Sequence, residues 1–265
     1  MSDRIRWPEV LDKARSIVLS YDTGVTLRQL FYRLVAAEIL PNRRAAYARL
    51  SDVTAQARRG GEFPPLVDRT REIHRHISFE DPEEAREWLK GLYRRDRTEN
   101  QDTSIYLGVE KHGIVEQLKS WFWQFGFPVL ALGGYSSQSY VDEIAADIED
   151  QGRPAVLIYA GDFDPSGEDI LRDFVERVRV FSGVQRIALN VDQVTKYDLP
   201  PQMGKATDPR ANSFMRKHGE LVQVELDALP PDVLRGLYQE AVLNYWDTST
   251  YQDVMQNERE DVALL

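Results

Sequence analysis

Two short apolar segments in the second half of the chain each end in acidic residues. Residues 105–109 are followed by Glu110, and residues 156–160 are followed by a glycine and then by Asp162 and Asp164. A carboxylate at the end of a buried segment is costly unless it is paired or binds a metal ion. If both segments are parallel strands, these carboxylates lie at one edge of a sheet. Three oxygen ligands suit Mg²⁺ or Mn²⁺.

A weaker interpretation of these acids stays open. Asp164 precedes Pro165, which is typical of a helix start, so Asp164 can cap that helix while Asp162 is solvated. Glu168 and Asp169 are expected to be first-turn acids that interact favourably with the helix dipole.

The second half of the chain alternates between apolar segments of strand length and segments with helical periodicity. This alternation predicts βαβ units and an α/β fold with a mainly parallel sheet. The expected strands are 104–109, 128–132, 154–160 and 184–190, with 221–226 as a further one. The expected helices are 111–125, 137–151, 167–180 and 230–246. Residues 133–137, a Gly-Gly-Tyr-Ser-Ser loop, are expected at the carboxyl edge of this sheet, where they can approach a phosphate.

The N-terminal third of the chain has helical periodicity. Helices are expected at 8–20, from an N-cap at Thr26, and at 43–59, where Gly60 and Gly61 end the third helix. An extended flap over 62–67 after three helices is the order of a winged helix, in which the third helix enters the DNA major groove. A plain helical bundle is the alternative. The third helix leaves five arginines on its outer face as candidate DNA contacts: Arg43, Arg44, Arg49, Arg58 and Arg59.

Charge is unevenly distributed along the 265 residues. The formal net charge is −10, but residues 1–100 contain 19 Lys and Arg against 16 Asp and Glu. Residues 101–265 contain 14 basic and 27 acidic residues. A basic first part beside an acidic second part fits a DNA-gripping module joined to a metal-holding module. We place the two at residues 1–97 and 98–265.

Composition excludes several classes of protein. The chain has no cysteine, so disulfides, cysteine zinc sites and thiol nucleophiles are excluded. No apolar segment approaches the roughly 20 residues that a membrane span needs, and the first residues lack the apolar core of a signal peptide. The expected location is cytoplasmic, without a membrane partner.

Tyr32 is a candidate nucleophile. It lies off the apolar stripe of the second helix, and Arg28 is one turn earlier on the same face. An arginine beside a tyrosine favours the phenolate and clamps a phosphate, and both effects suit attack on a DNA phosphate. A half-buried tyrosine with its hydroxyl in water is the alternative.

The motifs resemble those of the topoisomerase VI A subunit and the meiotic transesterases that make double-strand breaks. Residues 26–32, Thr-Leu-Arg-Gln-Leu-Phe-Tyr, are similar to the tyrosine motif of that family. Val109-Glu110-Lys111 and Asp-Phe-Asp-Pro-Ser-Gly at 162–167 are similar to the Glu and Asp-x-Asp motifs of its TOPRIM domain. The resemblance covers about residues 5–180, and the order, a winged-helix-like domain and then TOPRIM, also agrees.

This resemblance implies a fold and a reaction. It implies a homodimer on double-stranded DNA in which Tyr32 attacks a phosphate, Arg28 and Lys111 contact it, and Glu110, Asp162 and Asp164 hold Mg²⁺. The product is a 5′-phosphotyrosyl link. No nucleotide-binding loop is present, so strand passage driven by ATP requires a separate ATPase subunit.

Two other functions stay open. One is a hydrolytic TOPRIM endonuclease of the plasmid-defence type, in which water attacks and Tyr32 only packs. The other is a non-catalytic DNA-binding assembly protein. Three surface features are expected to be solvated without a role: residues 94–97, Glu225 and Asp227.

Overall fold

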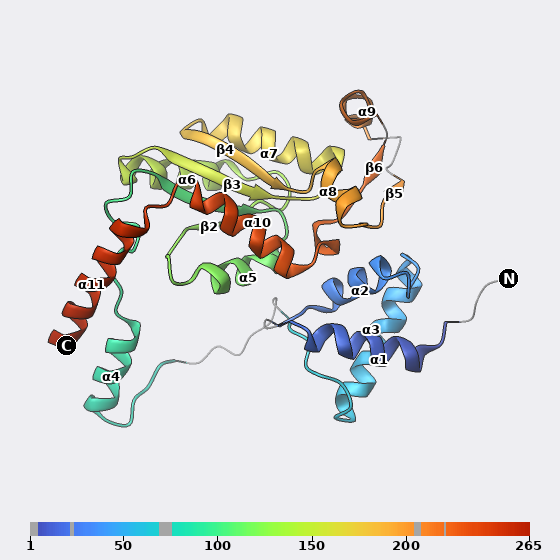
Figure 1. Ribbon diagram of the computed structural model, residues 1–265, viewed down its shortest axis with the longest axis horizontal. Coiled ribbons are helices and arrows are strands. Elements are labelled where there is room, and N and C mark those ends of the chain that lie inside the picture. The colour runs from blue at the N-terminus through green and yellow to red at the C-terminus, as the bar shows by residue number, and fades with distance from the viewer. Residues whose placement is uncertain (1–4, 22–23, 69–75, 204–207, 220) are drawn as a thin grey trace.

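The structure, a computed structural model, describes residues 5–21, 24–68, 76–203, 208–219 and 221–265. Within these residues the chain forms eleven α-helices and a four-stranded parallel sheet, so the predicted α/β class is confirmed (Figure 1). None of the described helices combines the length and the apolar composition of a membrane span.

The three N-terminal helices form their own hydrophobic core. They are α1 (Trp7–Leu19), α2 (Leu27–Ala36) and α3 (Arg44–Arg59), close to the predicted positions. Each pair is in contact, and Leu30 and Leu50 are fully buried between them.

Thr26 caps α2 as predicted. Its side chain accepts the Gln29 N–H, and the Gln29 side chain in turn accepts the Thr26 N–H at 3.0 Å. This capping box fixes where α2 begins, and therefore which face carries Arg28 and Tyr32.

The predicted flap over residues 62–67 is not a strand. The Glu62 N–H donates to the Ala57 carbonyl of α3 at 2.9 Å, and the Val67 N–H donates to the Val25 carbonyl at 3.1 Å, but these bonds do not form a strand ladder. Two prolines, Pro64 and Pro65, remove two of the donors that a strand would use. The described N-terminal residues thus contain three helices and no β wing, which agrees with the alternative of a plain helical bundle.

The sheet has the order β2–β1–β3–β4, with all neighbours parallel. Its strands are β1 (Ser104–Val109), β2 (Val129–Ala131), β3 (Ala155–Ala160) and β4 (Phe181–Ala188). β4 therefore starts earlier than the predicted residue 184. The central strands β1 and β3 are buried along their whole length, as a sheet covered on both faces requires.

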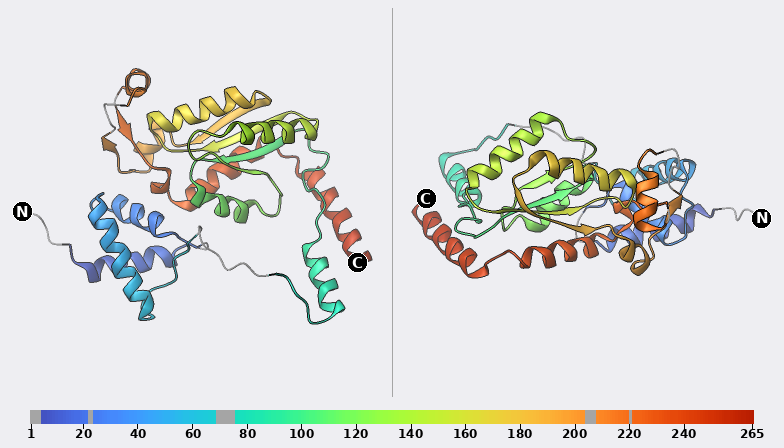
Figure 2. Two further views of the ribbon diagram at one scale, coloured as in Figure 1. Left: turned by 180° about the vertical axis from the view of Figure 1, so that it is seen from behind. Right: turned by 90° about the horizontal axis from the view of Figure 1, so that it is seen from above.

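Helices cover both faces of the sheet (Figures 1 and 2). α5 (His112–Phe122) and α10 (Pro231–Leu243) lie on one face, and α6 (Gln138–Gln151) and α7 (Pro165–Val178) lie on the other. Along β1, Ile105 faces the first pair and Tyr106 the second, following the two-residue period of a strand.

The remaining elements lie around the carboxyl edge and at the C-terminus. They are α8 (Val191–Lys196), β5 (Gln202–Met203), α9 (Ala211–His218), β6 (Val222–Gln223), the 3₁₀ turn η1 (Leu226–Ala228), α4 (Pro82–Leu92) and α11 (Thr248–Leu264). β6 is only two residues long, not the predicted 221–226, and α11 was not predicted at all. β5 and β6 pair antiparallel in a small separate sheet.

The basic segment 94–97 is not the solvated face that its sequence predicts. Arg97 is buried and forms a two-pronged ion pair with Glu258 of α11, at 2.5 and 3.0 Å. Arg95 pairs with Asp261 one turn further along α11, at 2.6 Å. These arginines therefore hold the C-terminal helix, which projects away from the sheet (Figure 1).

The helical core contacts the sheet core mainly through α2. α2 packs on η1, where Arg33 donates to the Ala228 carbonyl at 3.2 Å, and Gln29 donates to Gln117 of α5 at 3.0 Å. Tyr32 packs against both cores. The domain boundary after residue 97 stays a prediction.

Candidate functional site

The carboxyl edge of the sheet gathers the three predicted acids. Glu110 follows β1, and its Oε2 accepts the N–H of Asp162, which follows β3, at 2.8 Å. Asp164 caps α7 by accepting the Gly167 N–H at 2.6 Å, the alternative role that the sequence allowed. Asp162, however, is buried rather than solvated.

Gly167 allows these acids to meet. A Cβ added to this residue would lie 2.6 Å from the Asp162 carbonyl oxygen and 3.0 Å from Glu110 Oε2. The backbone of the first turn of α7 therefore approaches the acidic edge more closely than any side chain permits.

A substitution tests this close approach. We expect Gly167→Ala to lower the free energy of unfolding by about 1–3 kcal/mol, the usual cost of overpacking. Gly113→Ala in α5 is the matched control, because its added Cβ meets nothing within 4 Å and should stabilise the helix slightly. Urea unfolding of both variants measures the difference; equal stabilities would contradict the close approach.

Asp162 uses both carboxylate oxygens within the protein. Its Oδ1 accepts the Leu226 N–H at 2.8 Å, and its Oδ2 accepts the Lys111 ammonium at 2.5 Å. Burial raises the pKa of Asp162 to about 7, against the opposing effect of Lys111. Burial also raises the pKa of Glu110.

The three acids share one edge but do not form a ready set of metal ligands. In the part of the chain that the structure describes, no three acidic or histidine side chains are arranged to hold a metal ion. The reason is visible at Asp162, whose oxygens are occupied by an ammonium and a backbone N–H. As they stand, the residues do not fit a three-carboxylate Mg²⁺ site.

Lys111 and Arg28 connect this edge to α2 through two further acids. The Lys111 ammonium lies 2.6 Å from Glu225 Oε2, and Arg28 lies 2.9 Å from the same oxygen. Arg28 also pairs with Asp227 at 3.2 Å. The result is an unbroken chain of ion pairs from the sheet to the tyrosine helix.

Glu225 and Asp227 are thus not solvent-facing, as the sequence suggested, but part of the site. Asp227 is buried and Glu225 is half-buried. Burial opposes ionisation of Glu225, yet Lys111 and Arg28 outweigh it and lower the pKa of this carboxyl. Conversely, Asp162 and Glu225 outweigh burial and raise the pKa of Lys111.

Tyr32 lies beside this chain of ion pairs. The Arg28 guanidinium is 5.7 Å from the centre of its ring. A cavity of about 320 Å³ opens at the tyrosine, lined also by Arg28, Arg43, Arg44 and Tyr47. The cavity therefore joins the predicted nucleophile to the arginines of α3.

The predicted effect of Arg28 on Tyr32 is present but is outweighed by other groups. Arg28 does lower the pKa of the phenol, but burial and the Glu225 carboxylate raise it by more, so the net pKa of Tyr32 is above its usual value. Arg28 is already paired with two carboxylates, which reduces its field at the tyrosine.

The five candidate DNA contacts are alike in their exposure and in their pairing. All are exposed, and among the described residues none is paired with an acidic side chain: Arg43, Arg44, Arg49, Arg58 and Arg59.

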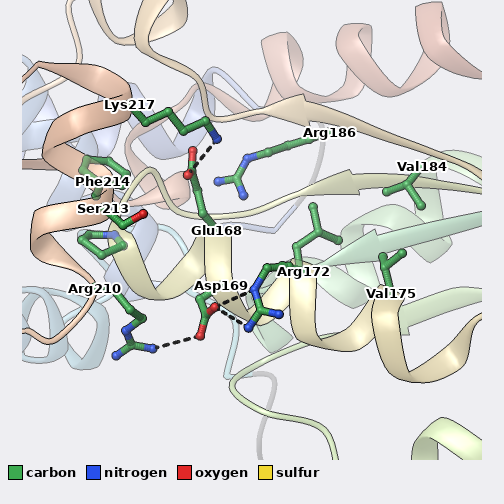
Figure 3. Close-up of a pocket in the computed structure, with 12 residues that line it drawn as sticks. Glu168, Asp169, Arg172, Val175, Val184, Arg186, Arg210, Ser213, Phe214 and Lys217 are labelled. Carbon is green, nitrogen blue, oxygen red and sulfur yellow. Dashed lines mark hydrogen bonds and ion pairs between the residues drawn. The ribbon is translucent and has the colours of Figure 1, made fainter.

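A second polar region lies at the first turn of α7 (Figure 3). A cavity of about 520 Å³ opens there, between α7, β4 and α9. Glu168 binds Lys217 of α9 at 2.9 Å, and Asp169 accepts the hydroxyl of Tyr135 from the loop 133–137 at 2.5 Å. The two first-turn acids therefore hold neighbouring segments in place, beyond their predicted interaction with the helix dipole.

Sequence reasoning missed Arg186. This β4 side chain donates to the Asp162 carbonyl at 2.6 Å and to the Leu189 carbonyl at 3.3 Å, so it ties together the ends of β3 and β4. No local motif marks it. Glu225 and Asp227 did carry a signal: the mostly apolar residues 221–224 are followed by a Glu-x-Asp pair, much as β3 is followed by the Asp-x-Asp pair.

Comparison with known proteins does not add to this description. No protein-family model matches the chain, and a comparison with curated proteins also finds no match.

Proposed function

We propose that this protein cleaves duplex DNA by transesterification, with Tyr32 as the nucleophile. The single observation that carries the proposal is that Arg28, one turn from Tyr32, pairs with Glu225 beside Lys111 and Asp162. Tyr32 and Asp162 are 130 residues apart in the sequence, yet Tyr32 lies beside the ion-pair chain that ends at Asp162. The motif resemblance to the topoisomerase VI A subunit supports the same function.

Each residue then has a chemical task. The Tyr32 oxygen loses its proton and attacks phosphorus, the bond from phosphorus to the 3′ oxygen breaks, and that oxygen takes up a proton as a free 3′-hydroxyl. The DNA 5′ end stays joined to the tyrosine. Arg28 and Lys111 are the proposed cations that neutralise the phosphate, since they are the two bases of the ion-pair chain beside Tyr32.

Mg²⁺ or Mn²⁺ remains the proposed cofactor, with Glu110, Asp162 and Asp164 as its proposed ligands. When bound, such an ion would stabilise negative charge on the reacting phosphate. It fits only if Lys111 first releases Asp162. A homodimer and a separate ATPase subunit also remain proposals.

Two features of Tyr32 favour hydrolysis as the second candidate. The pKa of Tyr32 is raised by burial and by Glu225, and the ring packs against both hydrophobic cores. Both features suit a structural tyrosine, with water as the nucleophile at the acidic edge.

Product analysis tests the proposed function. Supercoiled plasmid is incubated with the protein and Mg²⁺ or Mn²⁺, denatured, and analysed with and without protease. Transesterification predicts linear DNA that is released only after protease treatment, and Asp162→Ala should abolish it. Ends that are free without protease would establish hydrolysis instead, and the absence of any cleavage would leave only DNA binding.

The exposed arginines of α3 are proposed DNA contacts, and salt dependence tests them. Replacing both Arg43 and Arg44 with alanine should weaken duplex binding and flatten the slope of log affinity against log salt by about 2, since each phosphate contact contributes about 0.9. Fluorescence anisotropy at several salt concentrations measures this slope. Arg86→Ala, on the distant helix α4, removes one exposed arginine as a control and should leave the slope unchanged. An unchanged slope in the double variant would remove Arg43 and Arg44 from the interface.

A further inference from the structure

The contact that suggests a further role is at one oxygen of Glu225. Glu225 Oε2 accepts from the Lys111 ammonium at 2.6 Å and from the Arg28 guanidinium at 2.9 Å. Lys111 follows β1 in the sheet region, whereas Arg28 is on α2 in the helical region. One anionic oxygen held between an ammonium and a guanidinium has the same donors that a DNA phosphate oxygen would use.

The position of Glu225 is set by its own segment. It immediately follows the short strand β6 and precedes η1, and the Leu226 N–H is fixed by Asp162 at 2.8 Å. The neighbouring Val224 exchanges backbone hydrogen bonds with Phe163 at 2.9 and 3.0 Å. The backbone on both sides of Glu225 is therefore attached to the Asp-x-Asp segment, so its carboxylate is presented to Lys111 and Arg28.

The charges of Lys111 and Arg28 explain why the Glu225 carboxylate is useful at this position. Without Glu225, Lys111 would retain Asp162 as a partner, and Arg28 would retain Asp227. Each cation would then have one acidic partner rather than two, and its remaining N–H donors could bind another anion. With Glu225 in place, both cations are engaged twice.

We propose that Glu225 is an internal substitute for a DNA phosphate, occupying a phosphate site formed by Arg28 and Lys111. A phosphodiester that enters this site displaces the Glu225 side chain and takes over both cations. The site is thus occupied by the protein's own carboxylate when DNA is absent. This inference rests on the proposed function, because it names the group that the Tyr32 site binds.

The isosteric variant Glu225→Gln tests the inference by DNA binding alone, in EDTA, so that cleavage plays no part. We expect the variant to bind a short duplex roughly tenfold tighter at low salt, the size of one strong charge-assisted contact, with a salt slope steeper by about 1. Glu116→Gln is the matched control: it removes the same charge from an exposed pair with Lys119 on α5 and should change affinity less than twofold.

A double variant separates a specific site from a general charge effect. In the Arg28→Ala background, Glu225→Gln should give little further gain, because one of the two phosphate donors is missing. An equal gain with or without Arg28, or equal affinity of Glu225→Gln and the unaltered protein, would overturn the inference. Thermal unfolding of each variant confirms that it is folded.

A DNA-independent measurement keeps this inference distinct from the proposed function. Inorganic phosphate should raise the unfolding temperature of Glu225→Gln more than that of the unaltered protein, and this difference should vanish in the Arg28→Ala, Glu225→Gln double variant. If no form binds duplex, the proposed function fails while the phosphate result still decides the inference. Equal phosphate stabilisation of all forms would show that the site does not exist.

Discussion

Replacing Tyr32 with phenylalanine is expected to abolish the covalent protein–DNA link, by roughly a thousandfold or more, because no other group replaces an essential nucleophile. The phenyl ring keeps the contacts of Tyr32 with both hydrophobic cores, including the edge-on contact with Phe31 at 5.5 Å. The fold and the DNA affinity should therefore be nearly unchanged. Gel analysis of labelled DNA with and without protease measures the link.

Tyr47→Phe is the control for this experiment. Tyr47 lines the same cavity and also packs edge-on against Phe31, at 5.2 Å. It differs from Tyr32 in lying on α3, whereas Arg28 and Tyr32 are both on α2. The Tyr47→Phe variant should form the covalent protein–DNA link at the normal level. Free-ended products from Tyr32→Phe would assign the reaction to water, and a persistent protein link would place the nucleophile elsewhere.

The second large effect concerns stability and the C-terminal helix. Glu258→Ala should lower the free energy of unfolding by about 3–5 kcal/mol, because it leaves the Arg97 guanidinium buried without its counter-charge. Both side chains are only 8% exposed, and Glu258 also accepts the Arg95 N–H at 3.0 Å. Urea unfolding measures the loss, and hydrogen exchange should show α11 losing protection first.

Asp261→Ala provides the comparison within the same helix. Asp261 pairs with Arg95, but these side chains are 26% and 34% exposed, so the expected loss is much smaller than that of Glu258→Ala. If the two variants were equally stable, the burial of the Arg97–Glu258 pair would not be what holds α11 to the sheet region.

Local patterns were sufficient for most elements of the fold. The capping box at Thr26, the helical stripe of α2 and the fully apolar segments of β1 and β3 depend only on neighbours in the sequence. They predicted the α/β class and placed Glu110, Asp162 and Asp164 at one edge of a parallel sheet. The flap over residues 62–67 was predicted wrongly because an extended composition does not supply a partner strand.

Contacts between distant segments explain the remaining errors. The sequence of α11 has a weak apolar face, and that helix is held by ion pairs to residues 95 and 97, more than 160 positions away. Arg97 therefore looked like a solvated charge. Glu225 and Asp227 looked the same, because nothing in their own segment shows that Lys111 and Arg28 lie opposite them.

The sequence by itself identified the candidate residues: a tyrosine with an arginine one helical turn before it, and three acids that follow buried strands. Only the tertiary structure decided how their charges are paired. Lys111 meets Asp162 where the ends of β1 and β3 come together, and Arg28 reaches the same oxygen of Glu225 as Lys111 because α2 packs against η1. Periodicity determines which face of an element a side chain occupies, but the partner of a charge is set by packing between elements far apart in the chain.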